Sequence, residues 1–133
     1  MTPTSPTQLL QHLRLTTFDI MTNRKPLIYL ASPYSHPDPE ERERRFILVC
    51  RKCSELMASG LLIFSPIAHT HPVAVYGALP LHFDYWAEYD RRMIEVCDEL
   101  AVLMIDGWKQ SRGVIAELEI AKFLGKPISY LEL

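Results

Sequence analysis

The segment Ser111-Arg-Gly-Val-Ile-Ala-Glu117 combines a candidate anion site with a core-facing carboxylate on one predicted helix. Ser111 and Gly113 stand where this helix should begin, so its unbonded backbone N–H groups and positive dipole end can hold a negatively charged ligand. Glu117 follows Val114 by three residues and precedes Ala121 by four, which puts it on the apolar face. A carboxylate there is either paired structurally or functional, and the pattern alone leaves both interpretations open.

Asp90 interrupts the apolar face of a second predicted helix, over residues 82–97. Trp86, Ile94 and Cys97 share its face at steps of four and three. A satisfied structural carboxylate would explain this placement. Two carboxylates on facing helices would also suit glycosyl chemistry, in which a retaining mechanism needs them about 5–5.5 Å apart.

Two histidines, His69 and His71, fall in a stretch rich in proline and glycine, residues 67–81, which we expect to be a long irregular loop. Alternate histidines can bind zinc, but a site needs at least a third ligand, and we predict no metal. Contacts to substrate hydroxyls or phosphate are the preferred interpretation, and solvated loop histidines are the alternative.

Two aromatic residues are expected beside the carboxyl ends of strands, Tyr34 after the first strand and Trp108 after the third. Aromatic faces receive planar rings well, so either residue could stack on a nucleobase. Either could equally pack against its neighbours without touching a ligand.

The order of predicted elements indicates an α/β fold. Buried strands are expected over 26–32, 61–66, 100–105 and 127–131, and helices over 39–59, 82–97 and 111–124. This alternation is typical of a single doubly wound parallel sheet, Rossmann-like or flavodoxin-like, of four to five strands with helices on both faces. Ligands bind such sheets beyond the carboxyl ends of the strands, where the polar residues above are expected.

Composition limits the partners and the compartment. The chain has 133 residues, 48% of them hydrophobic, and a formal net charge of -2, which disfavours polynucleotides and anionic membranes. No apolar run approaches the roughly 20 residues of a membrane helix, and Cys50 and Cys53 fall on an apolar helix face. We therefore expect a cytoplasmic protein, with residues 1–24 as a mobile or weakly docked tail and 25–133 as one domain.

At this point the sequence resembles the nucleoside 2-deoxyribosyltransferase superfamily, especially its deoxynucleoside 5′-monophosphate N-glycosidase branch. The resemblance extends from Pro26 to Leu131, and the start Tyr-Leu-Ala-Ser-Pro-Tyr-Ser-His is most similar to a small bacterial and phage group. The matching motifs are Ile28-Tyr-Leu-Ala-Ser-Pro33, Asp90 eight residues before Asp98, and Ser111-x-Gly113-x-x-x-Glu117-Leu-x-x-Ala121 followed by Gly125-Lys-Pro127.

This resemblance implies cleavage of an N-glycosidic bond by double displacement, without a cofactor, in a homodimer or higher homo-oligomer. Glu117 would attack C1′ of a nucleoside or nucleoside 5′-monophosphate, with Tyr29 orienting it. Asp90, or a group it holds, would protonate the departing base. Ser111 and Gly113 would hold the 5′-phosphate or 5′-hydroxyl. Attack requires ionised Glu117, for which we expect a pKa near or below about 4.3.

The loop after the first strand, with Ser32, Pro33 and Tyr34, would line the substrate site by the same resemblance. One departure is Glu119, which stands where the family usually has glycine and would crowd the pocket. Three rival functions remain: a catalytically silent nucleotide-binding or sensing module, another nucleotide glycohydrolase of the NAD type, and a metal hydrolase built on His69 and His71.

Overall fold

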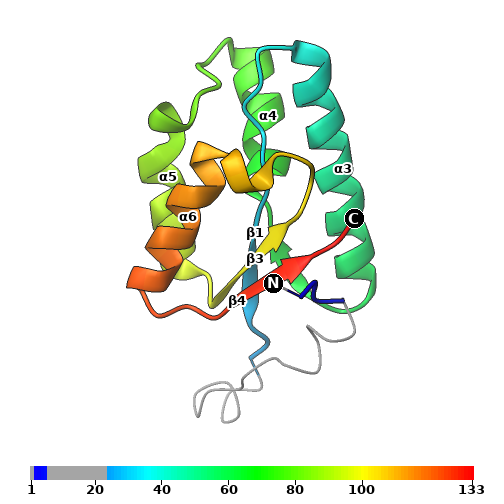
Figure 1. Cartoon of the computed structure of the whole chain (residues 1–133), viewed down its shortest axis with the longest axis vertical. Helices are drawn as coiled ribbons and strands as arrows, with labels where there is room; N and C mark the ends of the chain where they lie inside the picture. The colour runs from blue at the N-terminus through cyan, green and yellow to red at the C-terminus, as the bar shows by residue number, and fades with distance from the viewer. Residues whose placement is uncertain (1, 6–23) are drawn as a thin grey trace.

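One parallel sheet organises the protein. The computed structural model describes residues 2–5 and 24–133, and within them four strands form a sheet of order β2-β1-β3-β4. The elements along the chain are β1 (Leu27–Ala31), α3 (Pro39–Ala58), β2 (Leu62–Phe64), α4 (Pro66–Gly77), α5 (Phe83–Val96), β3 (Glu99–Leu103), η1 (Trp108–Gln110), α6 (Arg112–Phe123) and β4 (Ile128–Leu131). The predicted doubly wound α/β fold is confirmed (Figure 1).

The strand order creates a switch point at the centre of the sheet. β1 pairs with β2 through Ile28 and Ile63, and with β3 through Tyr29 and Leu100. The chain therefore leaves β1 in one direction to reach β2, then crosses back to reach β3. Ligand sites of open α/β sheets lie where the order reverses, outside the carboxyl ends of the strands, here those of β1 and β3.

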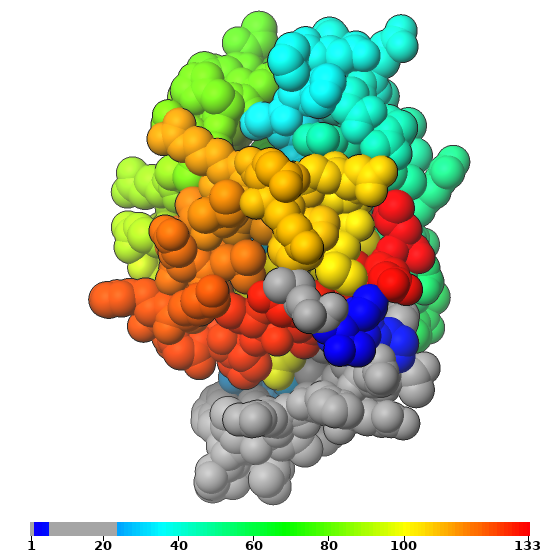
Figure 2. Space-filling view, viewed as in Figure 1, coloured from blue at the N-terminus to red at the C-terminus, as the bar shows by residue number. Residues whose placement is uncertain are grey.

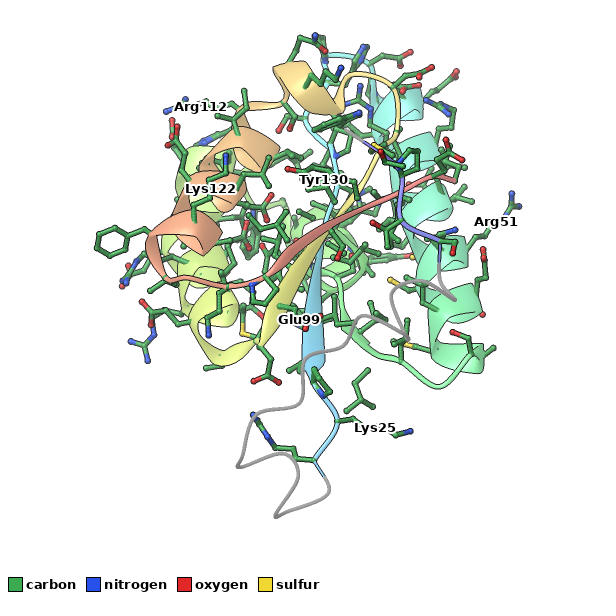
Figure 3. The ribbon with its side chains drawn as sticks, turned by 60° about the horizontal axis from the view of Figure 1, so that its bottom comes forward. Lys25, Arg51, Glu99, Arg112, Lys122 and Tyr130 are labelled. Atoms are coloured by element: carbon green, nitrogen blue, oxygen red, sulfur yellow. The ribbon has the colours of Figure 1, made fainter. Side chains whose placement is uncertain are left out.

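Helices cover both faces of the sheet. On one face, Val49 and Leu56 of α3 pack against Ile28 and Leu30 of β1 in a buried cluster. On the other face, Val114 of α6 belongs to a cluster with alternate residues of the same strand and with Ile94 of α5. Successive residues of a strand point to opposite faces, so β1 supplies side chains to both layers. The exposed side chains of Arg112 and Lys122 lie on the outer side of α6 (Figure 3).

The stretch predicted as a long irregular loop is mostly helical, so that prediction is wrong. α4 begins at Pro66, where proline is tolerated because the first helical N–H has no partner, and Ser65 caps it by accepting from the Ala68 N–H at 3.1 Å. Pro72 lies inside the helix. Thr70 Oγ1 donates to the Pro66 carbonyl at 2.8 Å, which satisfies one backbone group in this irregular helix.

The first described residues lie along the edge of the sheet. The Thr4 N–H donates to the Tyr130 carbonyl of β4, and the Tyr130 N–H donates back to Thr4 Oγ1 at 3.4 Å. Figure 2 shows this short segment beside the C-terminal residues. The remainder of the predicted tail lies outside the described residues. No described helix is long and apolar enough to cross a bilayer.

Candidate functional site

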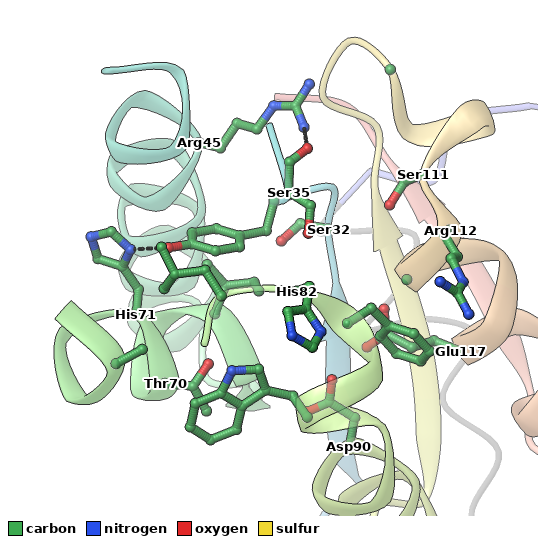
Figure 4. Close-up of a pocket in the computed structure, with 18 of the residues that line it drawn as sticks. Ser32, Ser35, Arg45, Thr70, His71, His82, Asp90, Ser111, Arg112 and Glu117 are labelled. Atoms are coloured by element: carbon green, nitrogen blue, oxygen red, sulfur yellow. Dashed lines mark hydrogen bonds between the residues drawn. The ribbon is translucent and has the colours of Figure 1, made fainter. Parts of the chain in front are cut away.

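A cavity of about 410 Å³ opens at the carboxyl ends of β1 and β3, at the switch point (Figure 4). Its size falls within the usual range for small-molecule sites. Its walls come from the loop after β1, α4, the start of α5, the loop after β3 and the start of α6. Glu117, Asp90, Ser32, Tyr34, His71, Ser111 and Gly113 all line it.

Glu117 and Tyr29 are joined at the base of this cavity. Glu117 on α6 is 4% exposed and Tyr29 on β1 is fully buried. The Tyr29 hydroxyl donates a hydrogen bond to Glu117 Oε2. Because this hydroxyl binds one carboxyl oxygen, the Tyr29 side chain of β1 fixes the orientation of the Glu117 side chain.

Two polar atoms next to this pair have no hydrogen-bond partner among the described residues. They are Oγ of Ser32, which is 5% exposed, and Oδ1 of Asp90, which is 7% exposed. An unsatisfied buried polar group costs about 1–3 kcal/mol. Such groups in native proteins call for an explanation, and a binding or catalytic role is one.

Burial governs the electrostatics of the two carboxyl groups. It raises the pKa of Glu117 to about 8, assisted by the charge of Asp90 and opposed by the hydrogen bond from Tyr29. Burial likewise raises the pKa of Asp90 to about 7. The expected low pKa of Glu117 is therefore wrong for the unliganded protein, since desolvation outweighs the helix N-terminus. At neutral pH the pair retains at least one proton and titrates as a unit.

The start of α6 forms the wall beside Glu117. Ser111 caps the helix by accepting from the Val114 N–H at 3.3 Å, and the N–H groups of the first turn have no partners within the helix. A side chain at Gly113 would meet the Phe83 ring at 3.4 Å. At the mouth, Arg112 pairs with Asp84 at 2.7 Å. This wall offers donors and positive charge to an anion.

On the opposite wall of the cavity, the side chains of Tyr34, His71 and Glu43 form a continuous hydrogen-bond network. His71 Nδ1 lies 2.5 Å from the Tyr34 hydroxyl, and its Nε2 lies 2.8 Å from Glu43 Oε2. The His71 ring also stacks on Phe46 with centroids 4.3 Å apart. Both ring nitrogens are therefore engaged, and Glu43, which is 54% exposed, extends the network to the surface.

Three residues predicted to line the site do not reach the cavity. His69 is exposed and stacks on Tyr89 with centroids 6.2 Å apart, because α4 turns it away from His71. Trp108 packs against Tyr130 of β4 instead, at 5.7 Å. Pro33 is buried outside the lining. Within the described part of the chain, no group of three or more His, Cys, Asp or Glu could hold a metal ion.

Other lining residues were missed, notably Arg45, His82 and Trp86. The run of arginines in α3 suggests a solvated face, yet the Arg45 side chain is only 11% exposed and reaches the carbonyls of Ser35 and Asp106. Its position four residues before buried Val49 was an available signal.

Glu119 does not crowd the site. It is exposed and lies in a groove between the outer sides of α5 and α6, beside Phe123, rather than in the cavity. Two residues along a helix turn a side chain by about 200°, so Glu117 and Glu119 point to different sides. The expected interference with Glu117 is therefore wrong.

Comparison with known proteins identifies a family. A comparison with curated proteins finds no match. Residues 26–133 match the family described as "Domain of unknown function (DUF1937)". Because this match extends over most of the sequence, the chain belongs to the DUF1937 family.

Proposed function

We propose that this protein cleaves or transfers the N-glycosidic bond of a nucleoside or nucleoside 5′-monophosphate through a covalent glycosyl-Glu117 intermediate. The observation that carries this proposal is the buried Tyr29–Glu117 hydrogen bond, in one cavity with Asp90 and the start of α6. The resemblance to the nucleoside 2-deoxyribosyltransferase superfamily supports it, because the motif residues for nucleophile and acid line the same cavity.

In the first step Glu117 acts as the nucleophile. Tyr29 occupies Oε2, so Oε1 attacks C1′ of the sugar. The Oε1–C1′ bond forms as the bond from C1′ to the base nitrogen breaks. The Asp90 carboxyl group gives its proton to the departing base and becomes a carboxylate, as a general acid does.

In the second step the covalent intermediate is resolved. The Asp90 carboxylate takes a proton from water, whose oxygen attacks C1′ and displaces the Glu117 carboxylate. A second free base in place of water would complete a transfer reaction. Both residues return to their starting protonation states, which balances the cycle.

The raised pKa values allow the pair to hold one proton at neutral pH, but in the unliganded protein that proton lies mainly on Glu117, whose pKa of about 8 exceeds that of Asp90, about 7, so the reaction requires it to move to Asp90. The reaction needs one proton between two carboxyl groups, and a shared proton is what burial of the pair produces at neutral pH. Tyr29 favours the ionised form of Glu117 by hydrogen bonding, so the monoanion with Glu117 charged and Asp90 protonated is the reactive form.

The start of α6 provides a place for the 5′-substituent. The Gly113 backbone and the Ser111 hydroxyl border the cavity beside Glu117, and a helix N-terminus attracts phosphate. The Arg112 guanidinium also lines the cavity, where it is paired with Asp84 and would have to exchange this partner to bind a phosphate. A nucleoside 5′-monophosphate would thus present C1′ to Glu117 while its phosphate rests on α6.

The test is a substrate panel with a matched pair of glutamate variants. Purified protein is incubated with ribo- and deoxynucleosides, their 5′-monophosphates and NAD, with and without a second base or a chelator, and released or exchanged base is measured by chromatography. We expect base release that Glu117→Gln abolishes and that exposed Glu119→Gln preserves. The acid-quenched protein should carry one added sugar on the α6 peptide.

Other outcomes point to the rivals. Tight nucleotide binding without turnover by any panel member rejects the proposal and indicates a silent binding module. Turnover of NAD alone indicates a different nucleotide glycohydrolase. Activity that the chelator removes and Glu117→Gln retains indicates a metal hydrolase.

A further inference from the structure

His82 lines the cavity, and a hydrogen bond from the backbone determines which of its two ring nitrogens carries the proton. It is the N-cap of α5, and its Nδ1 accepts a hydrogen bond from the Tyr85 N–H at 3.4 Å. Histidine is not among the residues that usually cap helices. In a neutral imidazole one nitrogen accepts while the other carries the proton. Capping through Nδ1 therefore places the proton on Nε2.

The Nε2–H of His82 has no acceptor among the residues that the structure describes. The ring's contact is an edge-on one with Tyr85, at 6.5 Å between centroids. The residue is exposed and lines the cavity near its opening. In Figure 4 its ring lies between the side that carries His71 and the side that carries Glu117. A hydrogen-bond donor is thus presented to the cavity with its tautomer fixed.

The neighbouring donors on this side of the cavity are already engaged. Both nitrogens of His71 have partners, and the Thr70 hydroxyl donates to the Pro66 carbonyl. Trp86 Nε1 donates to the Pro80 carbonyl at 2.8 Å. On the walls formed by α4 and the start of α5, His82 therefore supplies the donor still available to a ligand, apart from the Asp90 carboxyl group.

The proposed reaction decides which part of the ligand meets this donor. An in-line displacement at C1′ places the leaving base opposite the attacking carboxylate, on the far side of C1′ from Glu117. In Figure 4 the cavity extends from Glu117 past His82 toward His71. Tyr34, which contacts His71, and Ala74 also line the cavity. The ring faces and methyl groups there suit a planar apolar surface.

We propose that His82 Nε2–H donates a hydrogen bond to a lone-pair acceptor of the leaving nucleobase, which in a purine is the ring nitrogen N7 or N3. This inference rests on the proposed function for the direction in which the base lies. Nε2–H is the donor, because Nδ1 accepts from the Tyr85 N–H of α5. This hydrogen bond recognises an acceptor atom of the base and contributes nothing to recognition of the sugar phosphate.

The test measures equilibrium binding to protein carrying Glu117→Gln, so that turnover does not interfere. The ligands are 2′-deoxyadenosine 5′-monophosphate, its 7-deaza and 3-deaza analogues, and 2-deoxyribose 5-phosphate. His82→Ser keeps a side-chain cap for α5 but removes the ring donor. His69→Ser is the control, because His69 is exposed and outside the cavity.

We expect one deaza analogue to bind about tenfold more weakly than its parent, the effect of one hydrogen bond. His82→Ser should weaken the parent to the level of that analogue and abolish the difference between them. Binding of the base-free sugar phosphate should be unchanged, and His69→Ser should change nothing. Far-ultraviolet circular dichroism of His82→Ser checks that α5 is retained.

Two results would overturn the inference. One is equal binding of the parent and both deaza analogues, and the other is unchanged binding of the parent to the His82→Ser protein. Failure of the proposed function looks different: wild-type protein would release no base, while binding would still depend on His82 and on one ring nitrogen. Base release without that dependence rejects the role of His82 and retains the glycosidase.

Discussion

The two walls of the cavity differ in how completely their polar groups are paired. At the wall of Tyr34 and His71, each ring nitrogen of His71 has a partner, and Glu43 completes the network. At the wall of Glu117, Asp90 leaves a buried polar atom without a partner among the described residues, and Ser32, in the loop after β1, leaves another. Both walls are buried, so burial alone does not explain the difference.

This difference indicates a structural, bracing role for the wall of Tyr34 and His71 and is consistent with the proposed reactive role of the Glu117 wall. A fully satisfied network stabilises one geometry and has little capacity left for a ligand. A partly satisfied group, by contrast, destabilises the fold until something binds it, and it carries the shifted pKa values that catalysis uses. The wall of Tyr34 and His71 therefore holds α3, α4 and the loop after β1 together, whereas the proposed reaction takes place at the Glu117 wall.

The largest expected effect is a pH-dependent gain of stability in Glu117→Gln. Unfolded glutamate ionises near 4.5 and buried Glu117 near 8. Between these values the folded protein holds a proton that the unfolded chain has released, so the wild type loses stability as pH rises through this window. Glutamine has no proton to lose. At about 1.4 kcal/mol per pKa unit, the advantage of the variant grows by roughly 4–5 kcal/mol from pH 4 to pH 9.

Urea unfolding at a series of pH values measures this gain, with Glu119→Gln as the exposed control. Groups that do not interact with Glu117 cancel in the differences, whereas Asp90, which titrates together with Glu117, contributes to the gain. A constant difference between Glu117→Gln and the wild type across the whole pH range would mean that Glu117 is not held protonated by burial. The contrast between the two walls would then lose its electrostatic basis.

The next effect concerns Asp90→Asn, which should lower kcat by about 100-fold because it removes the proposed general acid. The pH profile should also change. In the reactive form Asp90 is protonated and carries no charge, so the acidic limb of kcat/KM should stay within about one pH unit of the wild-type limb. The decline above about pH 8, where the wild type loses the proton of Asp90, should disappear.

A substrate that needs no acid distinguishes chemistry from folding in this variant. An N7-methylated purine nucleotide carries a positive charge on its base and departs without protonation. Asp90→Asn should cleave it nearly as fast as the wild type does. An equal loss of kcat on methylated and ordinary substrates would show that Asp90 acts structurally. Glu88→Gln, on the exposed side of α5, is the control and should leave kcat on both substrates unchanged.

The sequence predicts most of this architecture because its signals are local. Apolar runs mark the strands, and Asp38 followed by Pro39 marks the start of α3, where Asp38 accepts from the Glu40 N–H. α4 escaped prediction because its prolines suggested a loop. Pro66 occupies the one helical turn where a missing N–H is harmless, and no local pattern shows that Pro72 will be accommodated inside the helix.

The site is predictable only where a polar residue breaks an apolar stripe. Glu117 and Asp90 do so, and both prove to be buried in the cavity. Their pKa values depend on how closely other elements enclose them, which spacing along a helix does not specify. The direction of a loop side chain is also non-local, which is why Trp108 was expected at the site and instead packs on Tyr130.

The smallest expected effect comes from the braced wall. Tyr34→Phe removes the hydroxyl that meets His71 Nδ1, and the unpaired buried acceptor should cost about 1–2 kcal/mol of stability, or a few degrees in Tm. Turnover should fall less than about threefold, because the ring remains and the reacting carboxyl groups are untouched. Thermal unfolding and initial rates measure both quantities, with exposed Tyr85→Phe as the matched control. A large loss of kcat with unchanged Tm would mean that the Tyr34 hydroxyl takes part in the reaction, and the division between a bracing wall and a reactive wall would have to be abandoned.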